Sequence, residues 1–568
     1  MEIKQSQLSL GRVSRPVMWS RLGRRVAGHG LAVWCLGLWL LASLLPGMAM
    51  AQTTLTWGVG GAGGSGTWSG TNTNWYNGAS NVAWSANNNA VFAGTSGTVT
   101  LGSNNLTANS LLFNTSGYTL AFGNTSGGRT LIISSLGGSA LGSTTFIGHE
   151  LLNTNGSVSI NVSGNTSFSG IVANNGTGQT SFSKSGTGRL TLAEGFNYTA
   201  SGNFSIAAGS VRLGTTSNLP SRLILSGSTG VDTVLELAAG NVSRDFSNFR
   251  GNGLTLGNSS NNLGFAAIGA DRILTMANPS DVTWGVAGDG FLVSQLILST
   301  ADSTNKLTFA HQTAGRGLRF TNTSGTTTRT IRTDNGLAEI DAEIAMPLLD
   351  GTSPGQVGAF TKTGAGVLAL AAVNTYTGPT TVSAGGLLVN GTTAAASAFS
   401  VSSGAFLGGI GRVGGGVTVN GGIAPGSNGI GTLTTGSGVT WNSGNSWLFQ
   451  LGTAAASLNA ASSNTDNDLL NVAGAFNSGT GSTFTFDFAN TGSDGWYKLI
   501  DYTTTNFATG TNTSFTANNV PSGKTANFVV DSASSALYVQ IVPEPSTIAL
   551  AAFGALTCLW ACRRRRTA

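Results

Sequence analysis

The chain of 568 residues has little charge, few histidines and almost no cysteine. Only 9% of its residues are charged, against about 25% in ordinary soluble domains. The three cysteines are Cys35, Cys558 and Cys562, and all of them fall in terminal apolar segments. The body between these segments therefore has no disulfide, no thiolate nucleophile and no cysteine-ligated zinc.

The apparent basicity of the chain comes from its two ends. The formal net charge is +5 and the pI is 9.3. Residues 1–51 hold six basic residues and one acidic residue, and residues 543–568 hold four arginines and one acidic residue. The remaining body has 17 basic and 20 acidic residues, a net charge of −3. Nucleic-acid binding, which a basic pI suggests, therefore loses its support.

The N-terminus has the pattern of a secretory signal peptide. Arginines between residues 12 and 25 precede an apolar core at 31–45, and Ala49-Met50-Ala51 follows as a small-x-small cleavage site. We expect cleavage after Ala51, so that the mature chain begins at Gln52. An uncleaved membrane anchor is the alternative, which Pro46-Gly47 and the cleavage site disfavour.

The C-terminus combines a short motif, an apolar run at 548–561 and a basic stop. The motif is Val542, Pro543, Glu544, Pro545, Ser546 and Thr547, and the stop is Arg563, Arg564, Arg565 and Arg566. This arrangement resembles the PEP-CTERM sorting signal of Gram-negative bacteria, and the resemblance implies removal of the tail by an exosortase. The run is shorter than the about 20 residues of a full span, so we expect a short transmembrane helix anchored by its arginines. An uncut tail anchor is the alternative.

The two prolines of the motif bear on its conformation. Proline lacks a backbone N–H and has a fixed φ, so we expect Pro543 and Pro545 to end regular structure. The motif would then be extended and accessible to a processing enzyme.

The body predicts an all-β fold. Short runs such as Phe484–Phe488, Leu223–Leu225 and Phe528–Val530 are rich in aromatic or β-branched residues and are bounded by Gly, Asn and Ser. Such runs are typical of strands joined by tight turns. No convincing long helix is predicted between residues 52 and 542.

Two segments of the body repeat each other. Residues 182–192 read FSKSGTGRLTL and residues 360–370 read FTKTGAGVLAL, and Tyr198 and Tyr376 follow at the same offset from each lysine. The second copy resembles the autotransporter-associated β-strand repeat, and the first is a degenerate copy. The signature residues of the second copy are Lys362, Gly364, Gly366, Leu368, Leu370, Asn374, Tyr376 and Gly378.

The resemblance implies a parallel, right-handed β-helix, a solenoid whose coils stack on one another. The leucines would supply its inward layer, and the glycines would permit its corners. We expect a signal peptide at 1–51, an N-terminal β-rich segment and cap at 52–180, and the β-helix at 181–480, clearest at 360–391. C-terminal strands at 481–541 and the sorting signal with its transmembrane segment at 542–568 would complete the chain.

Few residues offer catalytic or metal chemistry, and none is assigned to a catalytic, cofactor or metal site. Glu339, Asp341 and Glu343 alternate with Ile340, Ala342 and Ile344, which favours a solvated strand face over a catalytic cluster. Asp466 and Asp468 are calcium candidates, although a turn with Asx hydrogen bonds is favoured. His149 and His311 are isolated, which favours surface or turn positions. Trp57, Trp68, Trp75, Tyr76 and Trp84 favour an end cap over stacking on sugars.

These observations predict a non-enzymatic, exported, structural or adhesive β-helix protein. Its expected partners are the Sec machinery, an exosortase, the membrane before processing and an exopolysaccharide, with no nucleic acid and no cofactor. The expected location is the cell surface or extracellular matrix of a Gram-negative bacterium. The alternatives are a polysaccharide lyase or glycosidase on the same fold, and an exopolysaccharide-binding module.

Overall fold

The computed structural model divides the chain into two units, Met1–Gln52 and Thr53–Ala568. It describes residues 52–103, 105–122, 129–137, 141, 144–147, 156–174, 179–216, 219–246, 253–321, 323–462, 466–489 and 492–544. The signal cleavage residues Ala49 and Ala51, His149, Pro545, Ser546, Thr547 and Arg563–Arg566 lie outside the described residues. Within the described part, no helix is long and apolar enough to cross a membrane.

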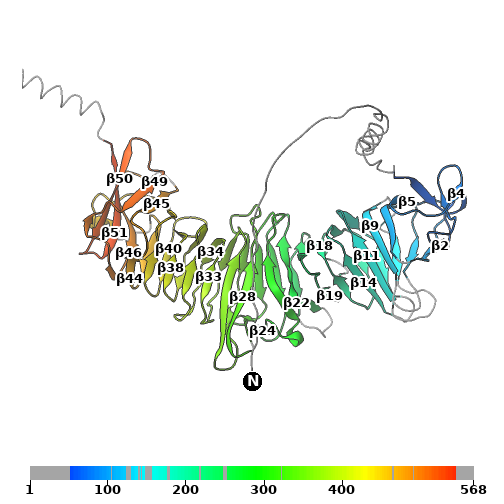
Figure 1. Ribbon diagram of the computed structural model, residues 1–568, viewed down its shortest axis with the longest axis horizontal. Coiled ribbons are helices and arrows are strands. Elements are labelled where there is room, and N and C mark those ends of the chain that lie inside the picture. The colour runs from blue at the N-terminus through cyan, green and yellow to red at the C-terminus, as the bar shows by residue number, and fades with distance from the viewer. Residues whose placement is uncertain are drawn as a thin grey trace, which may run out of the picture. The chain divides into compact units, whose positions relative to one another are not determined.

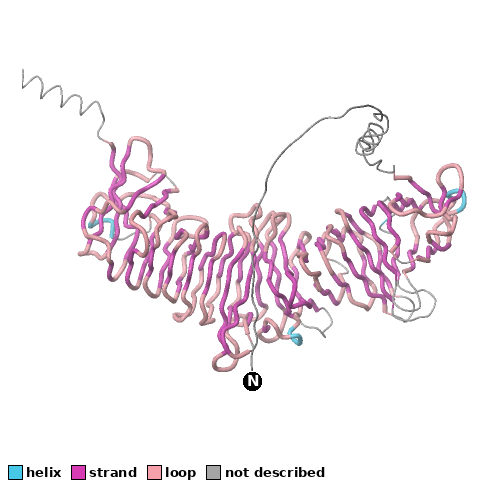
Figure 2. The backbone as a smooth tube through the Cα atoms, viewed as in Figure 1, coloured by secondary structure: helices cyan, strands magenta, loops and turns pink. Residues whose placement is uncertain are grey.

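The described residues form strands, loops and three 3-10 helices, η1 (Val59–Gly61), η3 (Ala287–Asp289) and η4 (Asn459–Ser462) (Figure 2). Strand alternation accounts for this architecture. In β14 (Thr180–Ser185) and β45 (Phe484–Phe488), every second side chain is buried, as expected for strands with one face in a core. The all-β prediction is confirmed.

Successive coils pair by parallel ladders, so neighbouring strands in space are far apart in sequence (Figure 1). We define column 1 as the ladder that runs from the N-terminal end of the body. It contains β1 (Thr54–Trp57), β5 (Asn88–Phe92), β7 (Leu106–Phe113), β9 (Arg129–Gly137), β11 (Gly156–Val162), β14, β17 (Phe204–Ile206) and β19 (Arg222–Leu225).

Column 2 begins beside column 1 and continues toward the C-terminal end. Its early strands are β12 (Thr166–Phe168), β15 (Arg189–Leu192), β18 (Gly209–Leu213) and β20 (Thr233–Leu237). Its later strands are β28 (Gly325–Arg332), β31 (Gln356–Thr363), β33 (Thr380–Val382), β35 (Phe399–Val401), β38 (Val417–Val419), β41 (Val439–Trp441), β44 (Ala475–Ser478) and β47 (Thr504–Thr505).

Column 3 holds β21 (Val242–Arg244), β23 (Arg272–Met276), β26 (Leu307–His311), β29 (Ala342–Ile344), β32 (Val367–Leu370), β34 (Gly385–Val389), β36 (Ala405–Gly409) and β39 (Gly422–Pro425). The sheet β42 (Trp447–Phe449), β45 and β49 (Phe515–Asn518) follows β39 along the stack. Two further sheets close other coils. They are β2 (Gly66–Trp68), β6 (Thr98–Leu101), β8 (Thr119–Ala121), β10 (Thr145–Ile147), β13 (Ile171–Ala173) and β16 (Asn197–Tyr198), and β24 (Val282–Thr283), β27 (Leu318–Arg319) and β30 (Leu348–Leu349).

The C-terminal coils are closed by a sheet that changes from parallel to antiparallel pairing. Its order is β37 (Arg412–Val413), β40 (Thr432–Thr435), β43 (Leu469–Val472), β46 (Gly495–Asp501), β51 (Ala536–Pro543), β50 (Lys524–Asp531) and β48 (Gly510–Thr511). The pairings β46–β51 and β50–β51 are antiparallel, and they end the parallel stack with a hairpin.

Two long strands join columns 1 and 2 in the middle of the body. β22 (Gly253–Ala267) pairs with β19 through Leu256 and with β20 through Leu263, and β25 (Phe291–Leu298) follows it. The register is interrupted between Asn258 and Asn262. The single strand β22 thus takes the place of two strands and the corner between them. The position of the strands around the coil therefore changes at this point of the β-helix.

The core is a continuous stack of inward aliphatic and aromatic side chains. Leu190, Leu192, Leu368 and Leu370 are 0% exposed, each on the inner side of its strand. Aromatic rings also stack between coils, as in Phe182 over Phe204, whose ring centroids lie 4.8 Å apart. Because each coil contacts only its neighbours, the core lengthens without becoming wider. The predicted parallel β-helix is confirmed.

Candidate functional site

The repeat signature centres on a buried lysine. Lys362 lies in β31 at 0% exposure. Its ammonium donates to the carbonyls of Thr363 at 3.0 Å, Gly364 at 2.8 Å and Ala384 at 3.1 Å. Thr363 ends β31 and Gly364 follows it, whereas Ala384 belongs to the next coil. The lysine therefore ties two coil corners together through charge-assisted hydrogen bonds.

The first repeat makes the same arrangement. Lys184 is 0% exposed, and its ammonium donates to Gly186 at 2.7 Å, Gly188 at 2.5 Å and Ala208 at 2.6 Å. Burial lowers the pKa of both lysines to about 8. Three acceptors on one ammonium compensate for the removal of its charge from water.

The two signature glycines are required by close packing at this corner. Gly364 has φ +78°, and a Cβ there would lie 2.4 Å from the Thr333 carbonyl oxygen. A Cβ on Gly366 would lie 2.5 Å from the Asp334 carbonyl oxygen. The Lys-x-Gly-x-Gly pattern therefore marks a corner at which the backbones of two neighbouring coils are in close contact.

Asp341 departs from the predicted solvated acidic face. It is 1% exposed, and its carboxylate accepts the N–H of Gly336 at 2.7 Å and of Val367 at 2.8 Å. Strand β29 begins only at Ala342, so the alternation predicted from Glu339 onward does not extend through Asp341. The prediction was wrong because a carboxylate that accepts two backbone N–H groups can be buried at a corner.

The other signature residues also connect coils. Asn374 accepts the N–H of Leu348 at 3.1 Å and donates to the Thr392 carbonyl at 3.2 Å. The hydroxyl of Tyr376 lies 2.6 Å from Thr380 Oγ1, and its ring is fully buried. A Cβ on Gly378 would lie 2.4 Å from the Gly358 carbonyl oxygen. These positions hold the stack together and leave no reactive group exposed.

The N-terminal tryptophans form an interlocked cap. Trp57, Trp68, Trp75 and Trp84 are at most 5% exposed. Trp68 contacts Trp75 and Trp84 edge to face, with ring centroids 5.0 and 4.9 Å apart. Phe92 continues the cluster and stacks on Phe113 of the next coil at 4.6 Å. Because Trp68 and Trp75 are both 0% exposed, they cannot stack on a sugar, and the capping interpretation is supported.

A polar cavity of about 280 Å³ lies over column 2 and its adjoining loops and includes Arg189, Asp232, Glu236 and Asp302. Glu236 is 3% exposed and accepts from Arg189 at 2.8 Å and Arg212 at 2.6 Å. Arg189 also pairs with Asp302 at 2.5 Å. These ion pairs join residues up to 113 positions apart.

The pKa of Asp232, one acid of this cavity, is lowered. Asp232 pairs with Arg332. Burial alone would raise the pKa of Asp232, but the hydrogen bonds from Arg332 and Asn262 outweigh it and lower the pKa. A general acid needs a carboxyl that keeps its proton near the working pH, and arginine partners favour the opposite state.

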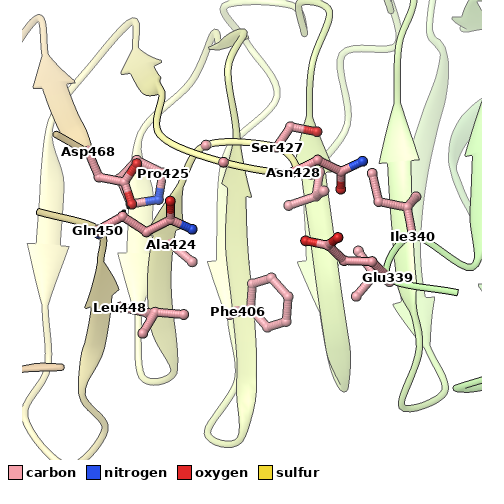
Figure 3. Close-up of a pocket in the computed structure, with 14 residues that line it drawn as sticks. Glu339, Ile340, Phe406, Ala424, Pro425, Ser427, Asn428, Leu448, Gln450 and Asp468 are labelled. Atoms are coloured by element: carbon pink, nitrogen blue, oxygen red, sulfur yellow. Dashed lines mark hydrogen bonds between the residues drawn. The ribbon is translucent and has the colours of Figure 1, made fainter. Parts of the chain in front are cut away.

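A second, smaller cleft lies on the outer side of column 3 (Figure 3). It has a volume of about 160 Å³. Apolar side chains that include Leu388, Phe406 and Leu448 form one part of it, and Asp468, Gln450 and Glu339 bring polar groups. The sequence signal was Phe406-Leu407, where strand alternation predicts one polar residue and the chain has two apolar ones.

Asp468 is the buried acid of this cleft. It is 1% exposed, and it accepts the N–H groups of Gly431 at 2.9 Å and Gln450 at 2.7 Å. Burial raises its pKa to about 7. The backbone bonds agree with the turn favoured for this position. Among the residues that the structure describes, no group of three or more His, Cys, Asp or Glu side chains is placed to hold a metal ion.

His311 is the last residue of β26 and is partly exposed, so it lies at the end of a strand and not in a turn. Its Nε2 lies 3.2 Å from the Ser280 carbonyl oxygen, and its Nδ1 accepts the N–H of Thr313 at 3.0 Å. Both ring nitrogens contact backbone groups, so neither is paired with a catalytic side chain in this arrangement.

The sorting motif begins inside the last strand of the β-helix. Val542 pairs with Thr525 and Pro543 pairs with Lys524 in the β50–β51 hairpin. The N–H of Glu544 donates to the Gly523 carbonyl at 2.7 Å. Strand β51 ends at Pro543, as expected for a residue that has no N–H to continue the ladder.

The comparisons with known families bear directly on these features. The model named Passenger-associated-transport-repeat matches residues 182–213 and 360–389. The model of the PEP-CTERM protein-sorting motif matches residues 542–566. The chain carries two passenger-associated transport repeats and a PEP-CTERM sorting motif. The passenger-associated repeats coincide with the two buried-lysine corners, and the sorting motif begins in the last strand of the terminal hairpin. Together they mark an exported cell-surface protein.

No curated protein matches the chain. Among solved structures, the Haemophilus influenzae Hap adhesin is similar at 11% sequence identity, over 83% of this chain and 65% of the adhesin chain. The TM-score is 0.17, so this likeness carries no argument here, and the chain spans less than two thirds of the adhesin's length. The assignment of the fold rests on the strand ladders described above.

Proposed function

We propose that this exported protein is a structural or adhesive β-helix that the Sec route delivers and an exosortase processes. The observation that carries the proposal is the PEP-CTERM motif at 542–566 joined to a body with passenger-associated repeats. The signal peptide would be removed after Ala51, and the membrane would hold the C-terminal segment until cleavage. The final location would be the cell surface or the extracellular matrix of a Gram-negative bacterium.

The contacts of the body support a structural role. Three residues of the repeats bond to backbone groups of neighbouring coils, namely Lys184, Lys362 and Asn374. A stack built in this way presents its outward side chains along a regular surface without a larger core. Such a surface is suited to contact with other cells or with a matrix.

The processing proposal is tested by the termini of the mature protein. Mass spectrometry of the protein from the cell surface should find Gln52 at the N-terminus and no Arg563–Arg566. Replacement of Pro543, Glu544 and Pro545 by alanine should retain the tail and leave the chain in the membrane fraction. A matched triple alanine variant at Thr511, Thr513 and Ser514 should be processed normally. Surface protein that still contains the arginine run would contradict the proposal.

The adhesive role is tested separately. Deletion of the gene should reduce cell aggregation and biofilm mass, and expression of the intact chain should restore both. A deletion strain with unchanged surface properties would argue against adhesion, even if the protein is exported and processed as proposed.

A polysaccharide-binding function is the second candidate, and the cleft beside Phe406 favours it. A lyase or glycosidase would require the carboxylates of the Arg189 cavity to act as acids or bases. Release of reducing ends or unsaturated products from a polysaccharide panel, lost in Glu236→Gln, would favour the enzyme over the structural protein.

A further inference from the structure

The outer face of column 3 is apolar where a β-helix normally meets water. Ile340, Ala369 and Leu388 form a small buried cluster on this face, and Val367 and Phe406 pack against it. The Phe406 ring lies against the backbone of the neighbouring strand, since a Cβ on Gly386 would be 2.1 Å from the ring. Leu448, at 42% exposure, continues the apolar surface. The ring is thus held in place by a glycine that provides the room for it.

Polar groups stand on both sides of this apolar floor. Asp468 and Gln450 lie on one side of Phe406, and Glu339 and Asn428 lie on the other (Figure 3). The two oxygens of Asp468 each accept one backbone N–H, at 2.9 and 2.7 Å. Each carboxylate oxygen has a further lone pair, so the group is held in position and can still accept a bond from a ligand.

Size and charge narrow the class of ligand. The volume of about 160 Å³ is below the ~300–1,000 Å³ of pockets for drug-sized ligands, so the cleft holds one ring and not an extended molecule. Glu339 and Asp468 are acidic, and none of the described residues that line the cleft is basic. A phosphate, sulfate or uronate would meet two carboxylates without a cation, which excludes anionic rings.

We propose that this cleft binds a single amine-bearing sugar ring, a hexosamine unit of a surface polysaccharide. Phe406 and Leu448 would pack against the apolar face of the ring, and Asp468 and Glu339 would accept from its ammonium and hydroxyl groups. A ring with one apolar face and a polar edge matches the floor and rims of the cleft. This proposal deepens the proposed function, because it names what an adhesive β-helix of this kind would hold.

The acid of the cleft adds a pH dependence. Burial raises the pKa of Asp468 to about 7. The charged groups that face it are Glu339 across the cleft and no basic group among the lining residues. Below the pKa the free carboxyl is protonated and its attraction for an ammonium is lost, so binding should weaken as the pH falls through this range.

The experiment is calorimetric titration of the full-length chain in detergent with a glucosamine trimer, an N-acetylglucosamine trimer and a galacturonic acid trimer. The glucosamine trimer should bind, the acetylated trimer should bind about tenfold more weakly and the uronate should not bind. Asp468→Asn should weaken glucosamine binding about tenfold and leave the weak binding of the acetylated trimer unchanged. Glu194→Gln removes one exposed carboxylate elsewhere and should change nothing.

A second variant avoids the buried acid. Leu448 is partly exposed, so Leu448→Arg should fold normally and abolish glucosamine binding by placing a cation in the cleft. Equal binding by the parent chain and Leu448→Arg would overturn the proposal and point to a nonspecific polycation effect. Binding of lysine-rich peptides but not of glucosamine would also overturn it, in favour of a protein partner. If the chain is exported normally but binds no sugar, only the proposed binding site is excluded. If the chain binds the sugar but is found in the cytoplasm, the proposed function is excluded and the binding site is retained.

Discussion

The ammonium of Lys362 donates a hydrogen bond of 3.1 Å to the carbonyl of Ala384, 22 residues further along the chain. Lys184 reaches Ala208 in the same way, at 2.6 Å and a separation of 24 residues. In each repeat one side chain therefore joins the corner of its own coil to the corner of the next. The stability of the stack should depend on these two lysines more than on any surface ion pair.

Replacement of Lys362 by methionine should destabilise the body by about 2–4 kcal/mol, because three buried carbonyls lose a charged donor. Thermal unfolding followed by circular dichroism would measure the change. Lys306→Met is the matched control, since Lys306 is 30% exposed and pairs with Glu343 on the surface, where a pair contributes about 0–1 kcal/mol. Equal effects in the two variants would contradict a special role for the corner lysine.

The stability of the body should fall as the pH rises from about 4 to about 7, through the titration of Asp468. Burial raises the folded-state pKa of Asp468 to about 7, above its ordinary value of 3.8. The contribution of this group is therefore fully present below the ordinary pKa and is lost as the pH rises through the folded-state pKa. Unfolding midpoints measured across this range should decline in the parent chain and stay nearly level in Asp468→Asn. Parallel pH profiles would show that Asp468 titrates normally.

Truncation of the cap should loosen the first coils. Trp75→Ala removes a 0% exposed ring that contacts Trp57, Trp68 and Trp84, and the expected cost is about 3–5 kcal/mol. Hydrogen exchange should accelerate in β5 and β7 before it does so in β38 or β41. Tyr76→Ala, at a partly exposed neighbour, should leave exchange in β5 unchanged. Uniform acceleration along the chain would contradict a cap that acts locally.

The ion pairs over column 2 differ in their expected contributions. Glu236→Gln leaves two guanidinium groups without their shared, 3% exposed carboxylate, and we expect a loss of about 3 kcal/mol. Asp302 is 68% exposed, so Asp302→Asn should cost less than about 1 kcal/mol. Chemical denaturation of both variants at low and high salt would test this ranking. A larger loss for Asp302→Asn would reverse the assignment of the central acid.

The all-β fold could be predicted because its signals are local, whereas the β-helix was implied by the resemblance of the two repeats to a known family. Alternation in Phe484–Phe488 and the turn glycines of the repeats report on the strand and the corner in which they lie. The inward position of Lys362 could not be predicted in the same way. A lysine is rarely buried, and the three carbonyls that satisfy it come together only when two coils are stacked. Asp341 was misplaced for the same reason, because its two N–H donors lie on separate segments.

The only sequence signal of the candidate cleft was the adjacent apolar pair Phe406-Leu407, and the other residues of the cleft could not be predicted. Phe406, Asp468 and Glu339 are separated by up to 129 residues in the chain and share a cleft only through the order of the coils. The aromatic cluster near the N-terminus was visible, and its burial was the favoured interpretation. The proposed sugar-binding cleft lies on the outer face of column 3 and does not involve those tryptophans.

The long strand β22 has a consequence for the two copies of the repeat. Lys184 aligns along its ladder with Leu256, whereas Lys362 aligns with Leu263 of the same strand. The copies are thus rotated by one side of the coil relative to each other, although they share the Lys-x-Gly-x-Gly pattern. One copy of the repeat therefore cannot replace the other. A shortened chain that fuses the first copy directly to the coil after the second would bring the corner of one to the flat side of the other. A shortened chain that still folds must therefore keep β22 and β25 to connect the coils of the two copies, or omit all coils on one side of these two strands.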